Sequence, residues 1–301
     1  MDPIRICKKT RRQFFTTLAG AAVAAPALTF AAGEKRLASD WVTLGQTNVK
    51  VTRLAFGTGT FSGRVQRELG QDGFNRLVRH AYDNGIRFFE TAEAYGGMHE
   101  MLGIALKGLP RDSYRLMTKF RWNRGIDDAG KRIDEYRKVL NSEYFDILLV
   151  HCVRTPGWAE ELKPLREHMQ EAKHKKIILS HGASCHGLDA INSFPNDKFL
   201  DVALCRVNHK GTKMDTPSRR DTDDLGDVPQ VTSLVKKIRS QGAGLIGMKL
   251  VGEGAFTKFE DRDAAMKYAF NVAGVQSATI GYKSPAEIDE AIARMARVLN
   301  S

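Results

Sequence analysis

Short apolar runs and segments with helical spacing alternate along most of this chain. Each run has the length and composition of a buried strand, and several end at a polar residue. The runs are Leu54–Phe56, Ile86–Phe89, Arg115–Thr118, Ile147–Val150, Lys176–Ser180, Val202–Val207, Gly244–Met248 and Ala278–Ile280. Amphipathic patterns between them predict helices, such as one near Gly73–Tyr82 that ends at Gly85 and one near Val231–Ile238 that ends at Gly242.

Strands that alternate with helices predict a parallel α/β sheet. Eight such strands match a closed (β/α)8 TIM barrel, and this is the fold that we expect. A doubly wound open sheet is the structural alternative. It is disfavoured because Gly57-Thr58-Gly59 follows the first strand without completing a G-x-G-x-x-G fingerprint.

The first 33 residues have the pattern of an export signal. Arg11 and Arg12 precede a weakly apolar, Ala-rich run from Leu18 to Ala32. A basic start, paired arginines and small residues at the end are typical of twin-arginine signals. A membrane anchor is the alternative, but the run is shorter than the roughly 20 apolar residues of a span and contains Pro26. We therefore expect a removable signal peptide over residues 1–33 and a barrel domain over residues 40–301.

Such a signal predicts a periplasmic or other extracytoplasmic location, reached through the twin-arginine translocon, with no stable membrane span after cleavage. The formal charge of the chain is +11, and residues 1–36, with seven basic and two acidic side chains, contribute +5 of it. The remaining charge of +6 is scattered, and no basic run alternates with aromatic residues. This pattern argues against a nucleic-acid partner.

Three successive strands end in residues that can take part in chemistry. The segment Phe88-Phe89-Glu90-Thr91-Ala92-Glu93-Ala94-Tyr95-Gly96 places an acid and a phenol just after an apolar run. The next two strands end in Lys119 and His151. Ligands of α/β proteins bind at the carboxyl ends of the strands, so this placement predicts a site.

Together these residues resemble the catalytic tetrad of the aldo-keto reductases, whose pattern is F-D-T-A-x-x-Y-G, then a strand ending in K and a strand ending in V-H. Glu90 takes the place of the family's aspartate. The resemblance covers the chain from about Val42 onward, and it implies that a hairpin, here Val42–Val51, closes the bottom of the barrel. It also implies roles: Tyr95 as the proton donor, Lys119 as its electrostatic partner, Glu90 as the carboxylate that holds the lysine, and His151 as the group that orients the substrate oxygen.

The physical reason for such a set is the weakness of a phenol as an acid. Its ordinary pKa is about 10, so an ammonium group must stabilise the anion that proton transfer leaves behind. A carboxylate in turn holds the ammonium group. The extra methylene of Glu90 moves that carboxylate by roughly 1.5 Å relative to an aspartate, which is enough to misplace a catalytic lysine.

The resemblance further implies a nicotinamide cofactor. The candidate contacts are Gly57, Thr58, Ser184, Asn208, Lys249, Lys283 and Glu287. Several family contacts are replaced: Leu204 stands for a glutamine, Glu287 for the arginine that binds the 2′-phosphate, and Ala291 for an asparagine near the adenine. A carboxylate repels a phosphate but accepts a hydrogen bond from a ribose hydroxyl. NAD is therefore favoured over NADP, and the loss of cofactor binding stays open.

Cysteines near the site leave several interpretations. Cys152 follows His151, and Cys185 and His186 close the fifth strand. Cys152 and Cys185 could form a disulfide, a thiol site or, with a histidine, a metal site. We favour two small residues of the pocket wall, because no C-x-x-C or H-x-x-x-H spacing supports a metal and none is predicted. Cys205 is expected on the helix-facing side of its strand.

The charged segment from His209 to Asp227 is interpreted as a mobile loop, with a lid over the barrel mouth as the alternative. The leading hypothesis for function is an oxidoreductase that reduces a small aldehyde or ketone with NAD(P). The alternative is an exported binding or metal/thiol protein that keeps this scaffold but has lost hydride transfer.

Overall fold

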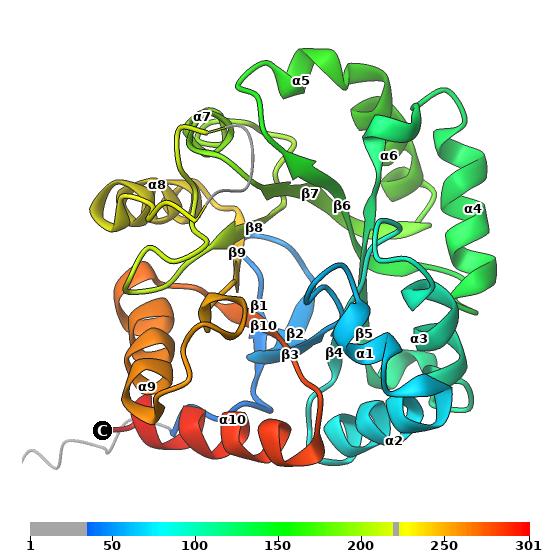
Figure 1. The fold of residues 1–301 in the computed structure, drawn as a ribbon. Helices are drawn as coiled ribbons and strands as arrows, with labels where there is room; N and C mark the ends of the chain where they lie inside the picture. The colour runs from blue at the N-terminus through cyan, green and yellow to red at the C-terminus, as the bar shows by residue number, and fades with distance from the viewer. Residues whose placement is uncertain (1–34, 219–222) are drawn as a thin grey trace, which may run out of the picture. The chain divides into compact units, whose positions relative to one another are not determined.

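Eight parallel strands close into a barrel in the computed structural model, which describes residues 35–218 and 223–301 (Figure 1). The order around the barrel is β10-β3-β4-β5-β6-β7-β8-β9. The strands are β3 (Leu54–Gly57), β4 (Phe88–Glu90), β5 (Arg115–Phe120), β6 (Phe145–Val153), β7 (Ile178–Cys185), β8 (Val202–Arg206), β9 (Gly244–Met248) and β10 (Ser277–Gly281). The predicted (β/α)8 barrel is confirmed, and the open sheet is excluded.

Helices surround the barrel on its outer face (Figure 1). They are α1 (Arg64–Arg67), α2 (Gly70–Asp83), α3 (Met98–Leu106), α4 (Ala129–Val139), α5 (Trp158–Glu161), α6 (Lys163–His174), α7 (Leu188–Ser193), α8 (Val228–Ser240), α9 (Phe259–Lys267) and α10 (Pro285–Val298), with short helical turns η1 (Arg111–Ser113), η2 (Trp122–Arg124), η3 (Gly252–Gly254) and η4 (Tyr268–Ala273). As predicted, α2 and α8 end just before glycines with positive φ, Gly85 at 87° and Gly242 at 102°.

The buried apolar side chains form two layers. The outer layer lies between the strands and the helices, and it contains Phe56, Phe89 and Leu148. The inner layer fills the barrel and contains Phe88 and Met117. Because successive side chains of a strand point to opposite faces, β3, β4, β5, β6, β8 and β9 each supply both layers.

A hairpin closes the lower end of the barrel, as the resemblance implied. Its strands β1 (Trp41–Thr43) and β2 (Lys50–Thr52) pair antiparallel. Leu44, Val49 and Val51 join the inner layer of the barrel. The turn lies so close to the start of β9 that a Cβ at Gly45 would lie 2.2 Å from the carbonyl oxygen of Gly242. Only glycine fits there.

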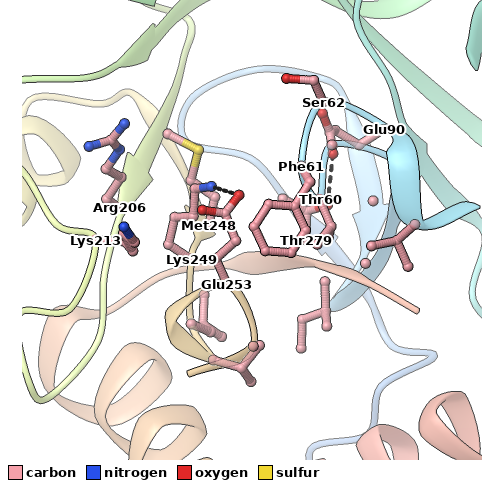
Figure 2. A pocket seen from close by; sticks show the side chains of 18 of the residues that line it. Thr60, Phe61, Ser62, Glu90, Arg206, Lys213, Met248, Lys249, Glu253 and Thr279 are labelled. Carbon is pink, nitrogen blue, oxygen red and sulfur yellow. Dashed lines mark hydrogen bonds and ion pairs between the residues drawn. The ribbon is translucent and has the colours of Figure 1, made fainter. Parts of the chain in front are cut away.

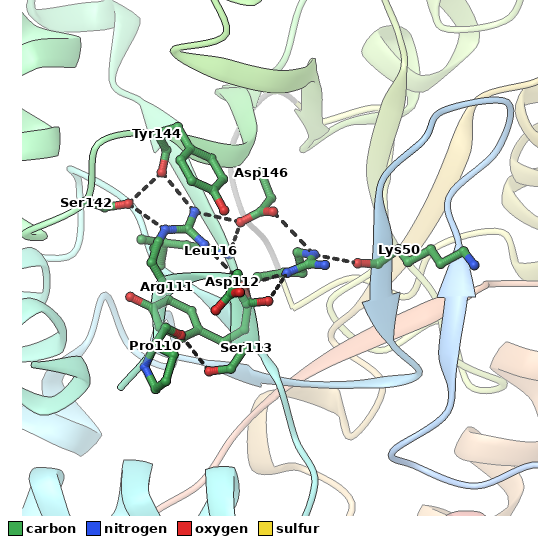
Figure 3. Close-up of polar contacts among 11 residues, drawn as sticks. Lys50, Pro110, Arg111, Asp112, Ser113, Leu116, Ser142, Tyr144 and Asp146 are labelled. Carbon is green, nitrogen blue, oxygen red and sulfur yellow. Dashed lines mark hydrogen bonds and ion pairs between the residues drawn. The ribbon is translucent and has the colours of Figure 1, made fainter. Parts of the chain in front are cut away.

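Buried polar contacts fasten this hairpin to the strands (Figure 3). The Asp146 side chain is 1% exposed and accepts hydrogen bonds from Arg111 Nη2 and the Leu116 amide, both at 2.8 Å. Arg115 lies 3.4 Å from the same carboxylate and donates to the carbonyl oxygen of Lys50 at 3.1 Å. These contacts stabilise the lower end of the barrel. The predicted catalytic residues lie at the upper end.

The proposed signal peptide lies outside the described residues, as do Arg219, Arg220 and Asp221 of the charged segment. Within residues 35–218 and 223–301, every helix is too short or too polar to cross a bilayer.

Candidate active site

Strand alternation carries three of the predicted catalytic residues into the barrel mouth. Glu90, Lys119 and His151 each stand two positions after an inner-layer residue of the same strand, namely Phe88, Met117 and Leu149. Two positions along a strand return the side chain to the same face. All three are buried, and the structure brings them together with Tyr95 as the sequence predicted.

Lys119 is the centre of this group. Its Nζ forms an ion pair with Glu90 Oε1 and donates to the carbonyl oxygen of Thr91 at 3.0 Å and to the Tyr95 hydroxyl at 3.1 Å. An ammonium group has three N–H donors, so these contacts use all of them. The side chain is 1% exposed, which means that the ammonium group is held by the protein and not by solvent.

The structure shows how the longer side chain of Glu90 is accommodated. Its Oε2 accepts a hydrogen bond from Thr279 Oγ1 at 3.1 Å, so the carboxylate joins Lys119 on one side to β10 on the other. A Cβ at Gly57 would lie 2.4 Å from Thr279 Oγ1 and 3.0 Å from Glu90 Oε2. The missing side chain at Gly57 leaves the space in which the extra methylene is accommodated.

Tyr95 is held with its hydroxyl at the cavity. Its ring packs edge-on against His151, with ring centroids 5.4 Å apart. A Cβ at Gly59 would lie 2.7 Å from the Tyr95 hydroxyl, so a larger residue there would displace it. Trp122 donates from Nε1 to the carbonyl oxygen of His151 at 2.8 Å and fixes the end of β6.

Burial and neighbouring charges set the protonation of these groups. Burial, followed by the Glu90 carboxylate, raises the pKa of Tyr95 well above its ordinary value, so the phenol is protonated at neutral pH. Burial, then Lys119 and His186, lower the pKa of His151 well below its ordinary value, so the imidazole is neutral. Burial also lowers the pKa of Lys119, and the ion pair with Glu90 opposes that effect. A neutral phenol beside an ammonium group is suited to give up a proton to a nascent alkoxide.

A cavity of about 1230 Å³ extends from the tetrad toward the first turn of α10. Pockets for single small ligands measure about 300–1,000 Å³, so this one has room for a cofactor together with a substrate. Figure 2 shows part of its wall, with Thr279 bonded to Glu90 and Lys249 paired with Glu253. Of the predicted cofactor contacts, Gly57, Lys249, Lys283 and Glu287 line the cavity.

The other three predicted cofactor residues lie beneath its surface, each fully buried. The hydroxyl of Ser184 accepts the amide of Cys152 at 2.8 Å. The Thr58 amide donates to the carbonyl oxygen of Glu90 at 3.0 Å. Asn208 donates to the carbonyl oxygens of Thr212 and Lys249 at 2.7 and 3.2 Å. The side chains of Ser184 and Asn208 thus support the backbone around the cavity, whereas the buried Thr58 hydroxyl has no hydrogen-bond partner among the described residues.

Glu287 occupies the entrance to α10. Its Oε2 accepts the amide of Lys283 at 2.8 Å, while its own amide donates to Ser284 Oγ at 3.3 Å. The N-terminal end of a helix is a ready site for an anion, and here a carboxylate of the chain already lies against it. The place is therefore unfavourable for a phosphate and compatible with a hydroxyl.

The cysteines do not form a shared site. Cys152 lines the cavity, whereas Cys185 belongs to the outer layer and its Sγ donates to the carbonyl oxygen of Gly187 at 3.3 Å. The two side chains thus lie on opposite faces of the barrel wall, which excludes a disulfide or a common metal between them. The expectation of two pocket-wall residues is right for Cys152 and wrong for Cys185. Cys205 lies in the outer layer, as predicted.

The described part of the charged segment is packed, contrary to the expectation of a mobile loop. Met214 and Asp215 are buried, Asp215 Oδ1 accepts the amide of Gly187 at 2.8 Å, and the carbonyl oxygen of Thr216 accepts the amide of Leu188 at 2.9 Å. The charged composition suggested a solvated loop, but the buried Asp215 anchors the segment to the end of β7. Lys213, in the same segment, lines the cavity.

Sequence reasoning did not assign roles to Arg206, Lys213, Arg154 or Trp122, all of which line the cavity. One signal was available for Arg206: it stands two positions after Leu204 and so faces the same side of β8. Arg154 and Lys213 come from loops and Trp122 from the short turn η2, and none of these segments has a strand or helix periodicity that indicates direction.

Comparisons with known proteins show the family and the fold. The family described as "Aldo/keto reductase family" matches residues 53–301. A soybean (Glycine max) aldo-keto reductase is 35% identical over 159 residues, or 47% of this chain and 45% of the relative. L-galactose dehydrogenase of Arabidopsis thaliana is 35% identical over 147 residues, or 44% of this chain and 46% of the relative. The chain thus spans somewhat less than half the length of these curated relatives.

Solved structures show the same fold at low identity. An aldo-keto reductase from Pseudomonas aeruginosa has a TM-score of 0.70 and 19% identity, covering 88% of this chain and 98% of its own. A holo form from Bacillus halodurans has a TM-score of 0.67 and 16% identity, with coverage of 85% and 90%. One from Klebsiella pneumoniae, in complex with NADPH, has a TM-score of 0.61 and 17% identity, with coverage of 87% and 89%.

Proposed function

The chain belongs to the aldo/keto reductase family, and on that premise we propose that it reduces a small aldehyde or ketone with a nicotinamide cofactor, with Tyr95 as the proton donor. The observation that carries the proposal is the position of Lys119. Its ammonium group joins the Glu90 carboxylate to the Tyr95 hydroxyl, with the His151 ring beside that hydroxyl.

Each residue has a distinct part in the reaction. His151, held neutral by its surroundings, orients the carbonyl oxygen toward Tyr95. The Tyr95 hydroxyl gives its proton to that oxygen as negative charge develops there, and the ammonium group of Lys119, 3.1 Å away, stabilises the phenolate. Glu90 keeps Lys119 charged and in place. A bound nicotinamide supplies the hydride.

The residues around the cavity fit a dinucleotide. The long cavity joins the tetrad to the entrance of α10, and Gly57, Lys249 and Lys283, which line it, would hold the cofactor. Tyr282 also lines that end, and its buried hydroxyl has no hydrogen-bond partner among the described residues. NAD is favoured over NADP because Glu287 lies where a 2′-phosphate would bring negative charge.

We also propose export through the twin-arginine translocon, on the strength of Arg11-Arg12 and the Ala-rich run that follows. Such an enzyme would meet its substrate outside the cytoplasm. It would be carried across the membrane folded.

The direct test is Tyr95→Phe, which removes only the hydroxyl. Loss of general acid help should lower kcat by about 10²–10⁴-fold, while the melting temperature and the Kd for NADH stay near those of the wild type. Tyr144→Phe, at the opposite end of the barrel, is the matched control and should keep full activity. Near-normal turnover by Tyr95→Phe would remove Tyr95 from the mechanism.

A further inference from the structure

The charged residues that line the cavity fall into three groups. Those of α9, α10 and the loop before α10 carry both signs, namely Arg262, Lys283, Arg294, Glu287 and Glu290. Lys249 and Glu253, just after β9, pair with each other. The third group is Arg121, Arg154, Arg206 and Lys213, and we call these four residues the cationic end.

Arg206 is the most deeply placed member of the cationic end. Its residue is 6% exposed, and its guanidinium contacts His186 Nδ1 and lies 3.9 Å from Asp215 Oδ1. Asp215 is itself fully buried and tied to the Gly187 amide. Burial of an arginine is unfavourable unless it is paired, so this arrangement holds a costly charge at the cavity wall. The planar fork of a guanidinium suits carboxylates and phosphates.

Lys213 adds a second, more adaptable charge. Its side chain is 33% exposed and pairs with Asp223, whose own side chain is 95% exposed. Such an exposed pair contributes little free energy, and Lys213 also lines the cavity. Figure 2 draws Arg206 and Lys213 on one side of the pocket and Phe61 and Glu90 on the other.

The cationic end lies close to the reacting groups. The His151 ring packs edge-on against Tyr95 at 5.4 Å and against His186 at 6.3 Å, and His186 contacts Arg206. After burial and Lys119, the charges that lower the pKa of His151 are those of His186, Arg121 and Arg154, so the positive field reaches the catalytic histidine. His151 and His186 thus form a continuous line of contacts from Tyr95 to Arg206 along the cavity wall.

We propose that the substrate is a small aldehyde or ketone with a carboxylate or phosphate a few bonds from its carbonyl, and that Arg206 and Lys213 bind this anion. The carbonyl chemistry rests on the proposed function, but the anion site does not depend on it. The phosphates of the cofactor are not the intended ligand: the proposed cofactor path runs toward α10, which follows β10, and β9 separates β10 from β8, the strand of Arg206.

The test compares matched substrates. Succinate semialdehyde, its uncharged methyl ester and butanal share a chain and differ in charge, and glyceraldehyde phosphate against glyceraldehyde tests a phosphate. A hydrogen bond to a charged group raises kcat/KM by about 10–100-fold. The kcat/KM of the wild type should therefore be higher by that factor for at least one anionic substrate than for its neutral analogue. The pair with the larger preference identifies the anion.

Three variants locate the effect. Lys213→Met should lower the preference for the anion about tenfold. Arg206→Lys keeps the buried charge that Asp215 needs but removes the fork, so it should lower the preference in a folded protein, as a melting curve would verify. Lys210→Met is the matched control: it removes the same charge from the same segment, but Lys210 pairs with Asp261 and does not line the cavity. It should leave the preference unchanged.

The outcomes separate the two proposals. Equal kcat/KM for anionic and neutral substrates, or an equal loss in Lys213→Met and Lys210→Met, would overturn the anion site and leave the reductase standing. If no carbonyl compound is reduced, calorimetry with succinate as the probe decides: binding that Lys213→Met abolishes supports the anion site without the reductase. Absence of both turnover and succinate binding refutes both.

Discussion

Shortening the acid that holds Lys119 tests the proposed site at its most unusual residue. In Glu90→Asp the carboxylate retracts by roughly 1.5 Å. One carboxylate can then no longer contact both Lys119 on β5 and Thr279 on β10, as Glu90 does through its two oxygens. Lys119 must either lose part of its ion pair or move away from the Tyr95 hydroxyl.

The size of the effect follows from Coulomb's law. Taking an ordinary ion-pair separation of about 2.8 Å and an effective dielectric constant of about 20, a retreat to about 4.3 Å removes about 2 kcal/mol of attraction. If all of it were lost from the transition state, kcat would fall about thirtyfold. If it were lost from the folded state instead, the melting temperature would fall by a few degrees.

The assay is NADH- and NADPH-dependent reduction of a panel of small aldehydes, with melting curves of the same preparations. Glu68→Asp is the matched control, because Glu68 pairs with Arg64 at 3.7 Å on the surface and its side chain is 69% exposed. That variant should change neither activity nor stability.

Two results would contradict the reasoning. Higher activity in Glu90→Asp would mean that the site is a decayed reductase whose geometry an aspartate restores. Unchanged activity and stability would mean that Glu90 does not set the position of Lys119. The space beside Gly57 and the bond to Thr279 lead us to expect neither, because both fit the longer acid.

Three further predictions concern other parts of the chain. Glu287→Gln should raise kcat/KM with NADPH relative to NADH about tenfold, since it removes a negative charge from the entrance of α10, and an unchanged cofactor ratio would place the 2′-hydroxyl elsewhere. Burial lowers the pKa of His99 from 6.5 to about 4, so the unfolded chain binds more protons between these values, and urea denaturation should show a stability loss of at most about 3 kcal/mol as pH falls through that window. His99→Gln should flatten that dependence, and an equal slope in the variant would assign it to other groups. Changing Arg11 and Arg12 together to lysine should leave a tagged precursor in the cytoplasm, and normal periplasmic levels on fractionation would disprove the twin-arginine signal.

Much of the architecture was legible in the chain itself. The alternation of apolar runs with helical spacing determined the eight strands, because buried parallel strands must be apolar on both faces. Glycines after two helices marked their ends, because the backbone there takes a left-handed conformation that glycine adopts with little strain. The exits of three strands carried Glu90, Lys119 and His151, and strand periodicity then placed them on one face.

What the sequence alone could not supply was distance between segments remote along the chain. That the longer acid is accommodated depends on Gly57 and on Thr279, which lies 189 positions away from Glu90. That Ser184 and Asn208 support the backbone instead of facing the cavity depends on which amide or carbonyl lies nearest. Arg206 on β8 lies beside Asp215, in a segment whose charged composition suggested a loose loop and which also brings Lys213 to the cavity. The local pattern of apolar and polar residues indicates which face of a strand a side chain lies on. Only closure of the barrel decides which side chains contact one another across it.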